Sequence, residues 1–355
     1  MKTKALALFA ALFAALTVFA APDINYALVP NANVFIGSDG NALKGTFLYK
    51  VCKHYEQFLQ ETLAKTVSED KDSKKLMDLM KSWPKEASEG GKFLASVDLS
   101  GISFDAEPDV NKIPFCLGFE FNVPVGIFVD KLIAELNQDK EFTKDVHIVK
   151  GKVAGLNGYD ITFTDLPKTT FALAVTHDGK TFFFSTKDFL AKQLALPKAP
   201  LPTLSPALLE ALKGVKPGSQ FGVTVGLSKN LLDAKNDFCA QGAKSGDADD
   251  AAMAKNLIPL TGASISLFSD ATTIKITVDG SFTNAEAPKF WKQLADTKLI
   301  PPAKQMLPSM IGKEKIPCIE TLACTANGTH CSLSLTITQA DIDILDSFVK
   351  QALAE

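Results

Sequence analysis

Two stretches of this chain share a pattern that predicts a β-hairpin. Residues 173–182 read LAVTHDGKTF, and residues 322–331 read LACTANGTHC. Each stretch has an Asx-Gly pair, Asp178-Gly179 or Asn327-Gly328, between alternating apolar and polar residues, and such a pair is typical of a two-residue type I′ turn. The two pairs lie 149 residues apart (327 − 178). The pattern therefore indicates one structural unit that occurs twice.

A two-residue turn also predicts which residues face each other across each hairpin. Val175 would face Phe182 in the first hairpin, and Cys324 would face Cys331 in the second. Opposed Cα atoms in an antiparallel pair lie about 4.5–5.5 Å apart, within the roughly 4.4–6.8 Å range of a disulfide. We therefore predict a structural disulfide between Cys324 and Cys331, with two reduced thiols packed in the core as the alternative. The buried face of the first hairpin should carry Phe171, Leu173, Val175, Phe182 and Phe184.

Other landmarks recur in the same order in the two halves of the chain. Cys52 lies 22 residues after Pro30, and Cys239 lies 22 residues after Pro217, which gives an offset of 187 between the halves. An offset of 162 relates one trio to another, namely Asn122, Phe128 and Leu132 to Asn284, Phe290 and Leu294. Each asparagine of the trios follows an expected strand and should cap the helix that comes next.

This repetition predicts an α+β fold of two homologous halves, each a mainly antiparallel sheet with helices packed against it. The first half would span residues 21–196 and the second residues 207–355. Between them, residues 197–206 hold four prolines and form the expected linker. Whether the halves share one sheet does not follow from the pattern.

The first 20 residues, MKTKALALFAALFAALTVFA, place two lysines ahead of an uncharged apolar run. This arrangement predicts a secretory signal peptide that is cleaved after Ala20. No later apolar run reaches the roughly 18 residues that cross a bilayer, so we expect no integral membrane segment after cleavage. The mature protein should be exported to a periplasm or to the extracellular space, where cysteines can form disulfides.

Three short sequence features, taken together with the expected signal peptide, support a resemblance to a known group of proteins. The strand opening Leu28-Val29-Pro30, the turn Asp178-Gly179 and the helical sequence FLAKQL at residues 189–194 follow the expected signal peptide. In this layout the chain resembles exported bacterial proteins that are built of tandem α+β repeat units. The resemblance implies the fold and the export, and it implies no activity and no site residues.

The charged residues argue against two classes of partner. The chain has 37 basic and 40 acidic residues, a net charge of −3, and every basic residue is a lysine. This balance lacks the positive surface that binds nucleic acid or an anionic membrane. Without arginine, the chain also lacks the planar fork that recognises phosphate or guanine in two places at once. We therefore expect no nucleic acid partner.

No group of residues in the sequence matches a known pattern of catalysis or metal binding. The cysteines near the second hairpin, Cys318, Cys324 and Cys331, lack the close pairs of a zinc site, and His330 should point away from Cys331. The other histidines are scattered and do not recur in both halves: His54, His147 and His177. The acidic group at residues 247–250 is better explained as the start of a helix. We predict no cofactor, no metal and no catalytic residue.

These observations favour a non-catalytic exported protein with a binding or structural role. Its partner would be a protein, a polymer or an apolar ligand. One alternative is a secreted hydrolase whose site is assembled from residues distant in sequence. Another is a carrier of an apolar ligand, which would have a cavity of several hundred Å³ between its helices and its sheet.

Overall fold

A computed structural model describes residues 25–55, 84, 90–102, 109–196, 204–244, 247–310 and 315–354. The expected signal peptide and most of the expected linker, residues 197–203, lie outside these ranges. The division of the chain at residues 197–206 therefore stays a prediction.

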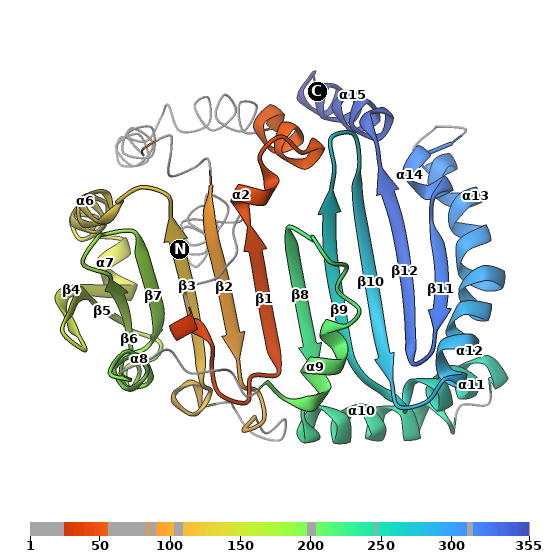
Figure 1. The fold of residues 1–355 in the computed structure, drawn as a ribbon, viewed down its shortest axis with the longest axis horizontal. Coiled ribbons are helices and arrows are strands. Elements are labelled where there is room, and N and C mark those ends of the chain that lie inside the picture. The colour runs from red at the N-terminus through yellow and green to blue at the C-terminus, as the bar shows by residue number, and fades with distance from the viewer. Residues whose placement is uncertain are drawn as a thin grey trace.

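One antiparallel sheet of 12 strands runs through the described chain (Figure 1). The strand order is β11-β12-β10-β9-β8-β1-β2-β3-β7-β6-β5-β4. This arrangement confirms the α+β class, and it shows that both halves contribute to one continuous sheet. The strands are β1 (Val34–Asp39), β2 (Gly91–Val97), β3 (Phe115–Phe121), β4 (Val146–Val153), β5 (Leu156–Phe163), β6 (Thr170–Val175), β7 (Thr181–Thr186), β8 (Phe221–Gly226), β9 (Leu260–Ser269), β10 (Ile274–Phe282), β11 (Ala323–Asn327) and β12 (His330–Ile337).

Helices lie around and across this sheet. In Figure 1 the helices from α10 to α15 surround the margin of the second half, and α9 lies at β8 and β9. Residues 47–55 are also helical. The α-helices are α2 (Gly40–Leu43), α6 (Gly126–Leu136), α7 (Phe142–Asp145), α8 (Lys187–Leu194), α9 (Pro206–Leu212), α10 (Lys229–Gly242), α11 (Ala248–Leu257), α12 (Glu286–Leu294), α13 (Ile300–Met310), α14 (Pro317–Glu320) and α15 (Gln339–Ala354). Shorter elements are the 3-10 helices η1 (Asn25–Ala27) and η2 (Val110–Lys112) and the π-helix η3 (Ala295–Leu299).

The junction of the two halves is the pair of strands β1 and β8. These strands are antiparallel, and Ile36 is the cross-strand partner of Val223. From this junction outward, the strands of the first half run β1-β2-β3-β7-β6, and those of the second half run β8-β9-β10-β12-β11. The two series have the same order of connections along the chain, and β4 and β5 extend the first half alone.

Both faces of the sheet are buried over β2, β3 and β7 of the first half, where many of its phenylalanines lie. One face packs against η1, α8 and α9 through a core that includes Leu94, Cys116, Ala172, Ala174, Phe183, Leu190 and Leu208. The opposite face packs with the start of α6 through Phe93, Ala95, Phe119, Phe121, Val125 and Phe182. Of the first hairpin, Phe171 and Phe182 are buried on the predicted face, while Leu173, Val175 and Phe184 are partly buried.

The first hairpin has the predicted register and a different turn. Val175 is the partner of Phe182, as expected. However, the loop comprises the four residues 177–180, and within the Asx-Gly pair only Gly179 has a positive φ (68°). A type I′ turn requires positive φ at both central residues, so that prediction is wrong. The cross-strand partners are nevertheless the predicted ones, because the four-residue loop is centred on the same two residues, Asp178 and Gly179, as the expected two-residue loop.

The second hairpin differs from the predicted register. Asn327 pairs with His330, so Gly328 and Thr329 form the turn, and only Gly328 has a positive φ (56°). Glycine at the first central position is the pattern of a type II′ turn. The turn therefore begins one residue later than expected. As a result Cys324 pairs with Leu333 and Cys331 with Ala326, and the prediction that the two cysteines directly oppose each other is wrong.

The two asparagines that were expected to cap helices behave differently. The Asn284 side chain accepts hydrogen bonds from the backbone N–H groups of Glu286 (3.1 Å) and Ala287 (3.0 Å), which confirms its capping role at α12. Asn122 instead donates to the side chain of Asn41 (3.0 Å), and α6 begins only at Gly126 without a side-chain cap. The acidic start of α11 is confirmed, because Asp247 is its N-cap.

Candidate functional site

The second half of the sheet has one polar face and one apolar face. Because side chains alternate along a strand, residues in register share a face across β8, β9, β10 and β12. The polar face is defined by Thr224, Ser264, Ser266, Asp279, Ser281, His330 and Ser332. The apolar face is defined by Val223, Ile265, Leu267, Ile276, Val278, Leu333 and Leu335. These names are used below for the two sets.

Helix α9 covers the polar face at very close range. A Cβ atom added to Gly226 would lie 2.2 Å from the backbone nitrogen of Leu208, and one added to Gly262 would lie 2.8 Å from the Ala211 Cβ. Glycine therefore allows the helix to approach the backbone of β8 and β9. Leu208 and Ala211 are fully buried in this contact. The covered polar side chains of Thr224, Ser264 and Ser281 are buried as well, although such groups normally face water in an antiparallel sheet.

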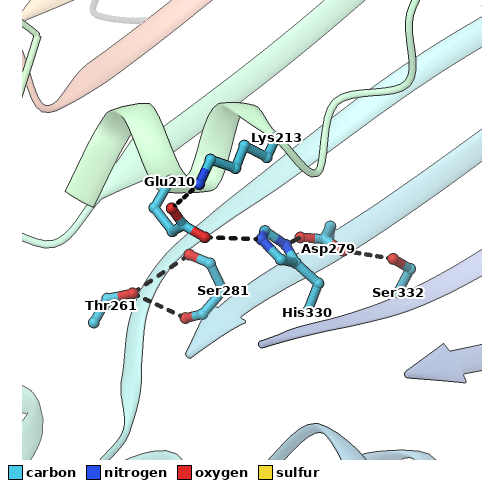
Figure 2. Close-up of polar contacts among 7 residues, drawn as sticks. All are labelled: Glu210, Lys213, Thr261, Asp279, Ser281, His330 and Ser332. Atoms are coloured by element: carbon cyan, nitrogen blue, oxygen red, sulfur yellow. Dashed lines mark hydrogen bonds and ion pairs between the residues drawn. The ribbon is translucent and has the colours of Figure 1, made fainter. Parts of the chain in front are cut away.

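A charged cluster joins α9 to this face (Figure 2). His330 Nδ1 lies 2.7 Å from Asp279 Oδ1, and His330 Nε2 lies 3.4 Å from Glu210 Oε1 of α9. The Ser332 hydroxyl donates to the other oxygen of Asp279 (2.5 Å), and Lys213 forms an ion pair with Glu210. The Asp279 side chain is only 2% exposed. The histidine thus lies between a buried carboxylate of the sheet and a carboxylate of the helix.

This geometry explains what the cluster can do chemically. Both ring nitrogens of His330 face carboxylates, and the Ser332 hydroxyl donates to Asp279 and not to the histidine. Nucleophilic catalysis needs a base with a free acceptor nitrogen beside the nucleophile. The cluster instead links α9, β10 and β12 by charge and hydrogen bonds. Both ring nitrogens of His330 thus have partners, and the side chain points to the opposite face from Cys331, as the sequence predicted.

The carboxyl group of Glu210 makes the stability of this link depend on pH. Its hydrogen bond with Lys213, and further its contact with His330, hold the pKa of Glu210 below its ordinary value of 4.5. A lowered pKa in the folded state contributes stability above the unfolded pKa, and this contribution is lost as the pH falls through the folded pKa. We expect the stability difference between the wild type and Glu210→Gln to shrink from pH 7 to pH 3 in urea unfolding. A difference that is constant over this range would contradict the assignment.

The apolar face is open to solvent in its centre. Ile265, Val278 and Leu333 are 44%, 43% and 38% exposed, and they are neighbours in one row across β9, β10 and β12. The row continues through Val223 to Ile36 at the junction. An exposed apolar row on three adjacent strands is unusual, because the exposed face of an antiparallel sheet is normally polar.

Helices border the open area on two sides. At one end of the strands, Phe47 and Val51 of the helix at 47–55, together with Ile342 of α15, pack against Ile276 and Ile337. Along the outer edge, the residues that follow α12 pack over β11 through Ala295, Ile300 and Cys324. The exposed row therefore lies between two bordering helical layers.

The predicted cysteine pair lies at the outer margin of the apolar face. Cys324 and Cys331 are diagonal neighbours on the same face, and their Sγ atoms are 3.5 Å apart as free thiols. The disulfide between them stays a prediction. Cys116 and Cys239 are buried elsewhere, and the backbone N–H of Cys318 donates to Asp341. Within the described ranges, no three acidic, histidine or cysteine side chains form a metal-binding group.

The remaining histidines do not converge on a site. His54 lies 3.0 Å from Asp346 of α15 with its side chain 55% exposed, and His147 is exposed on β4. His177 lies in the loop of the first hairpin. None of the helices in the described part of the chain is both long and apolar enough to span a bilayer.

Comparisons with known proteins give structural neighbours only. No family model and no curated protein matches the chain. Crystal form III of the Treponema protein TP0453 is similar with a TM-score of 0.38 and 9% identity, covering 91% of this chain and 96% of that chain. Crystal form IV of TP0453 has a TM-score of 0.37 and 10% identity, and the match covers 90% of this chain and 94% of that chain. Crystal form I has a TM-score of 0.34 and 11% identity, and the match covers 92% of this chain and 98% of that chain.

Proposed function

We propose that this chain is a non-catalytic exported protein that binds the hydrocarbon part of an apolar or amphipathic ligand on the open apolar face. The observation that carries the proposal is that the polar face of the second half is buried while its apolar face is exposed, the reverse of the usual arrangement. Helix α9 covers serine, threonine and a charged cluster, while aliphatic side chains of the same strands stay exposed. An exposed apolar surface of this kind typically marks a binding site.

The dimensions of the open area favour a hydrocarbon chain over a protein surface. Neighbouring strands lie about 4.8 Å apart, so the row from Val223 to Leu333 spans roughly 14 Å. A stable protein interface covers about 800 Å² on each partner. The bordering helices restrict the space beside this row. Full burial of a large aliphatic side chain contributes about 1.5–3 kcal/mol, so covering the exposed part of each residue should contribute about 1 kcal/mol.

We also propose that the two halves are homologous and that binding belongs to the second. The common strand order supports the duplication. So does the junction, because Ile36 and its partner Val223 differ by 187 residues, which is the offset between Pro30 and Pro217. In the first half, the residue next to Ile36 in the row is Ala95, which is only 2% exposed. The equivalent face is thus covered in one half and open in the other.

Binding of a dansyl-labelled fatty acid, followed by its fluorescence, tests the proposal. Val278 lies in the middle of the exposed row, between Ile265 and Leu333. In Val278→Asn, a bound hydrocarbon would bury an unpaired amide, which costs roughly 1–3 kcal/mol. We expect the Kd to rise at least about tenfold.

The adjacent residue of the same strand supplies the control. Thr277 faces the opposite side of β10, where its partners are Ser266 and Ser334. Thr277→Asn places the same side chain one residue away, and it should bind the probe like the wild type. Far-UV circular dichroism must show both variants folded. The proposal is wrong if the wild type does not bind the probe, or if both variants lose affinity equally.

A further inference from the structure

The two thiols on the β11–β12 hairpin lie closer together than ordinary core neighbours. Their Sγ atoms are 3.5 Å apart, and a disulfide requires about 2.05 Å. Cys324 is 7% exposed and packs with Ala295 and Ile300. The two side chains share a face in diagonal positions, where Cα atoms lie about 7–8 Å apart, slightly beyond the roughly 4.4–6.8 Å range of a disulfide. Bond formation therefore needs rotation of both side chains together with a small local shift of the hairpin backbone. The backbone does not need to change its register.

We infer that Cys324 and Cys331 form an intramolecular disulfide in the presence of a low-molecular-weight disulfide such as oxidised glutathione. The bond locks β11, the last strand of the sheet, to β12. This inference does not depend on the proposed ligand.

The surroundings of the two sulfur atoms assign the order of the steps. Burial, together with the contact with Cys324, raises the pKa of Cys331 to about 12. Burial and the nearby carboxylate of Asp296 raise the pKa of Cys324 too, but the contact with Cys331 and the nearby ammonium of Lys292 act in the opposite direction. Cys324 is therefore the thiol that ionises first, and the thiolate is the reactive form.

The reaction consists of two exchange steps. The Cys324 thiolate attacks one sulfur of oxidised glutathione, which forms a mixed disulfide and releases one glutathione thiolate. The Cys331 thiolate then attacks the Cys324 sulfur, forms the intramolecular bond and releases the second glutathione thiolate. The two protons of the protein thiols protonate the two leaving groups. One oxidised glutathione is thereby reduced to two thiols while one protein disulfide forms.

Mass spectrometry of the full folded chain measures this directly. The protein is incubated with oxidised glutathione, denatured without reductant and alkylated, and peptides are then mapped. We expect the wild type to lose alkylation at Cys324 and Cys331 together and to yield one linked peptide pair. Treatment with a reductant should restore both sites. Alkylation of both residues after oxidation, or their linkage to other cysteines, would overturn the inference.

Single substitutions test the order of the steps. Cys331→Ser should stop at the mixed disulfide, with one glutathione attached to Cys324. Cys324→Ser should leave Cys331 without glutathione, because its thiol keeps its proton. Cys52 is exposed, so both variants are made in a Cys52→Ser background. Glutathione on Cys331 and not on Cys324 would reverse the assigned order, while the wild-type experiment would still decide whether the bond forms.

Discussion

Replacing Asp279 with alanine should lower the free energy of unfolding by about 3–5 kcal/mol. The Asp279 carboxylate accepts hydrogen bonds from two side chains, and each buried donor that loses its acceptor costs about 1–3 kcal/mol. In Asp279→Ala, the Ser332 hydroxyl loses its acceptor, and the imidazole of His330 keeps only Glu210 at 3.4 Å. Urea unfolding followed by far-UV circular dichroism measures the loss.

An exposed aspartate supplies the control for this substitution. Asp249 of α11 forms an ion pair with Lys298, and both side chains are more than half exposed. Exposed ion pairs contribute about 0–1 kcal/mol, so Asp249→Ala should stay within about 1 kcal/mol of the wild type. If Asp279→Ala were equally mild, the charged cluster would not be what holds α9 to the sheet.

Replacing Gly226 with alanine should destabilise the protein by about 3 kcal/mol or more. The added Cβ would lie 2.2 Å from the Leu208 backbone nitrogen and 2.6 Å from the carbonyl carbon of Ala207. Backbone atoms of a packed helix cannot move aside as a side chain can, so α9 must shift outward. Overpacking of a buried contact typically costs 1–3 kcal/mol, and contact with backbone places this site at the upper end.

Gly222 provides a matched control on the same strand and the same face. A Cβ added there meets its nearest atoms at 3.8 Å, which is an ordinary contact distance. Gly222→Ala should therefore leave the midpoint of thermal unfolding nearly unchanged or slightly raised, because alanine restricts the unfolded chain. Equal losses in both variants would mean that β8 tolerates no side chain for reasons unrelated to α9.

The elements that follow from local pattern were predictable from the sequence. The alternation in residues 170–186 predicts the first hairpin and its register. The second hairpin shows the limit of this reasoning. Glycine can occupy the second position of a type I′ turn or the first position of a type II′ turn, and the choice moves every cross-strand partner. Because the turn starts one residue later, the cross-strand partner of Cys324 is Leu333 and not Cys331.

The charged cluster could not be predicted, because its members come from three elements far apart in the chain. Glu210 and His330 are 120 residues apart, and Asp279 lies 51 residues before His330. A signal was nevertheless present. Asp279 stands in the middle of a strand, and His330 and Ser332 alternate on the following hairpin. An acid inside an expected strand needs a partner on the neighbouring strand.

The sequence pattern of the strands also could not predict which face of the sheet is exposed to solvent. Ser264 and Ile265 alternate in β9, which predicts one polar and one apolar face. The usual rule buries the apolar face. Here the rule fails because α9 approaches at Gly226 and Gly262, and both glycines lie on the polar side. Which face a helix covers depends on contacts between distant elements.

The strand pair at the junction has a consequence for how such a molecule can arise. If the two halves are homologous, as we propose, Ile36 and Val223 are equivalent positions as well as cross-strand partners, and an approximate local two-fold axis passes between them. A chain of one unit would make the same junction by pairing this strand with its counterpart in a second molecule, as a symmetric dimer does. In the proposed duplication, fusion would turn that association into an intramolecular step that does not depend on protein concentration. Fusion would also allow the two proposed copies to differ in sequence, so that one keeps its apolar face covered while the other leaves it open.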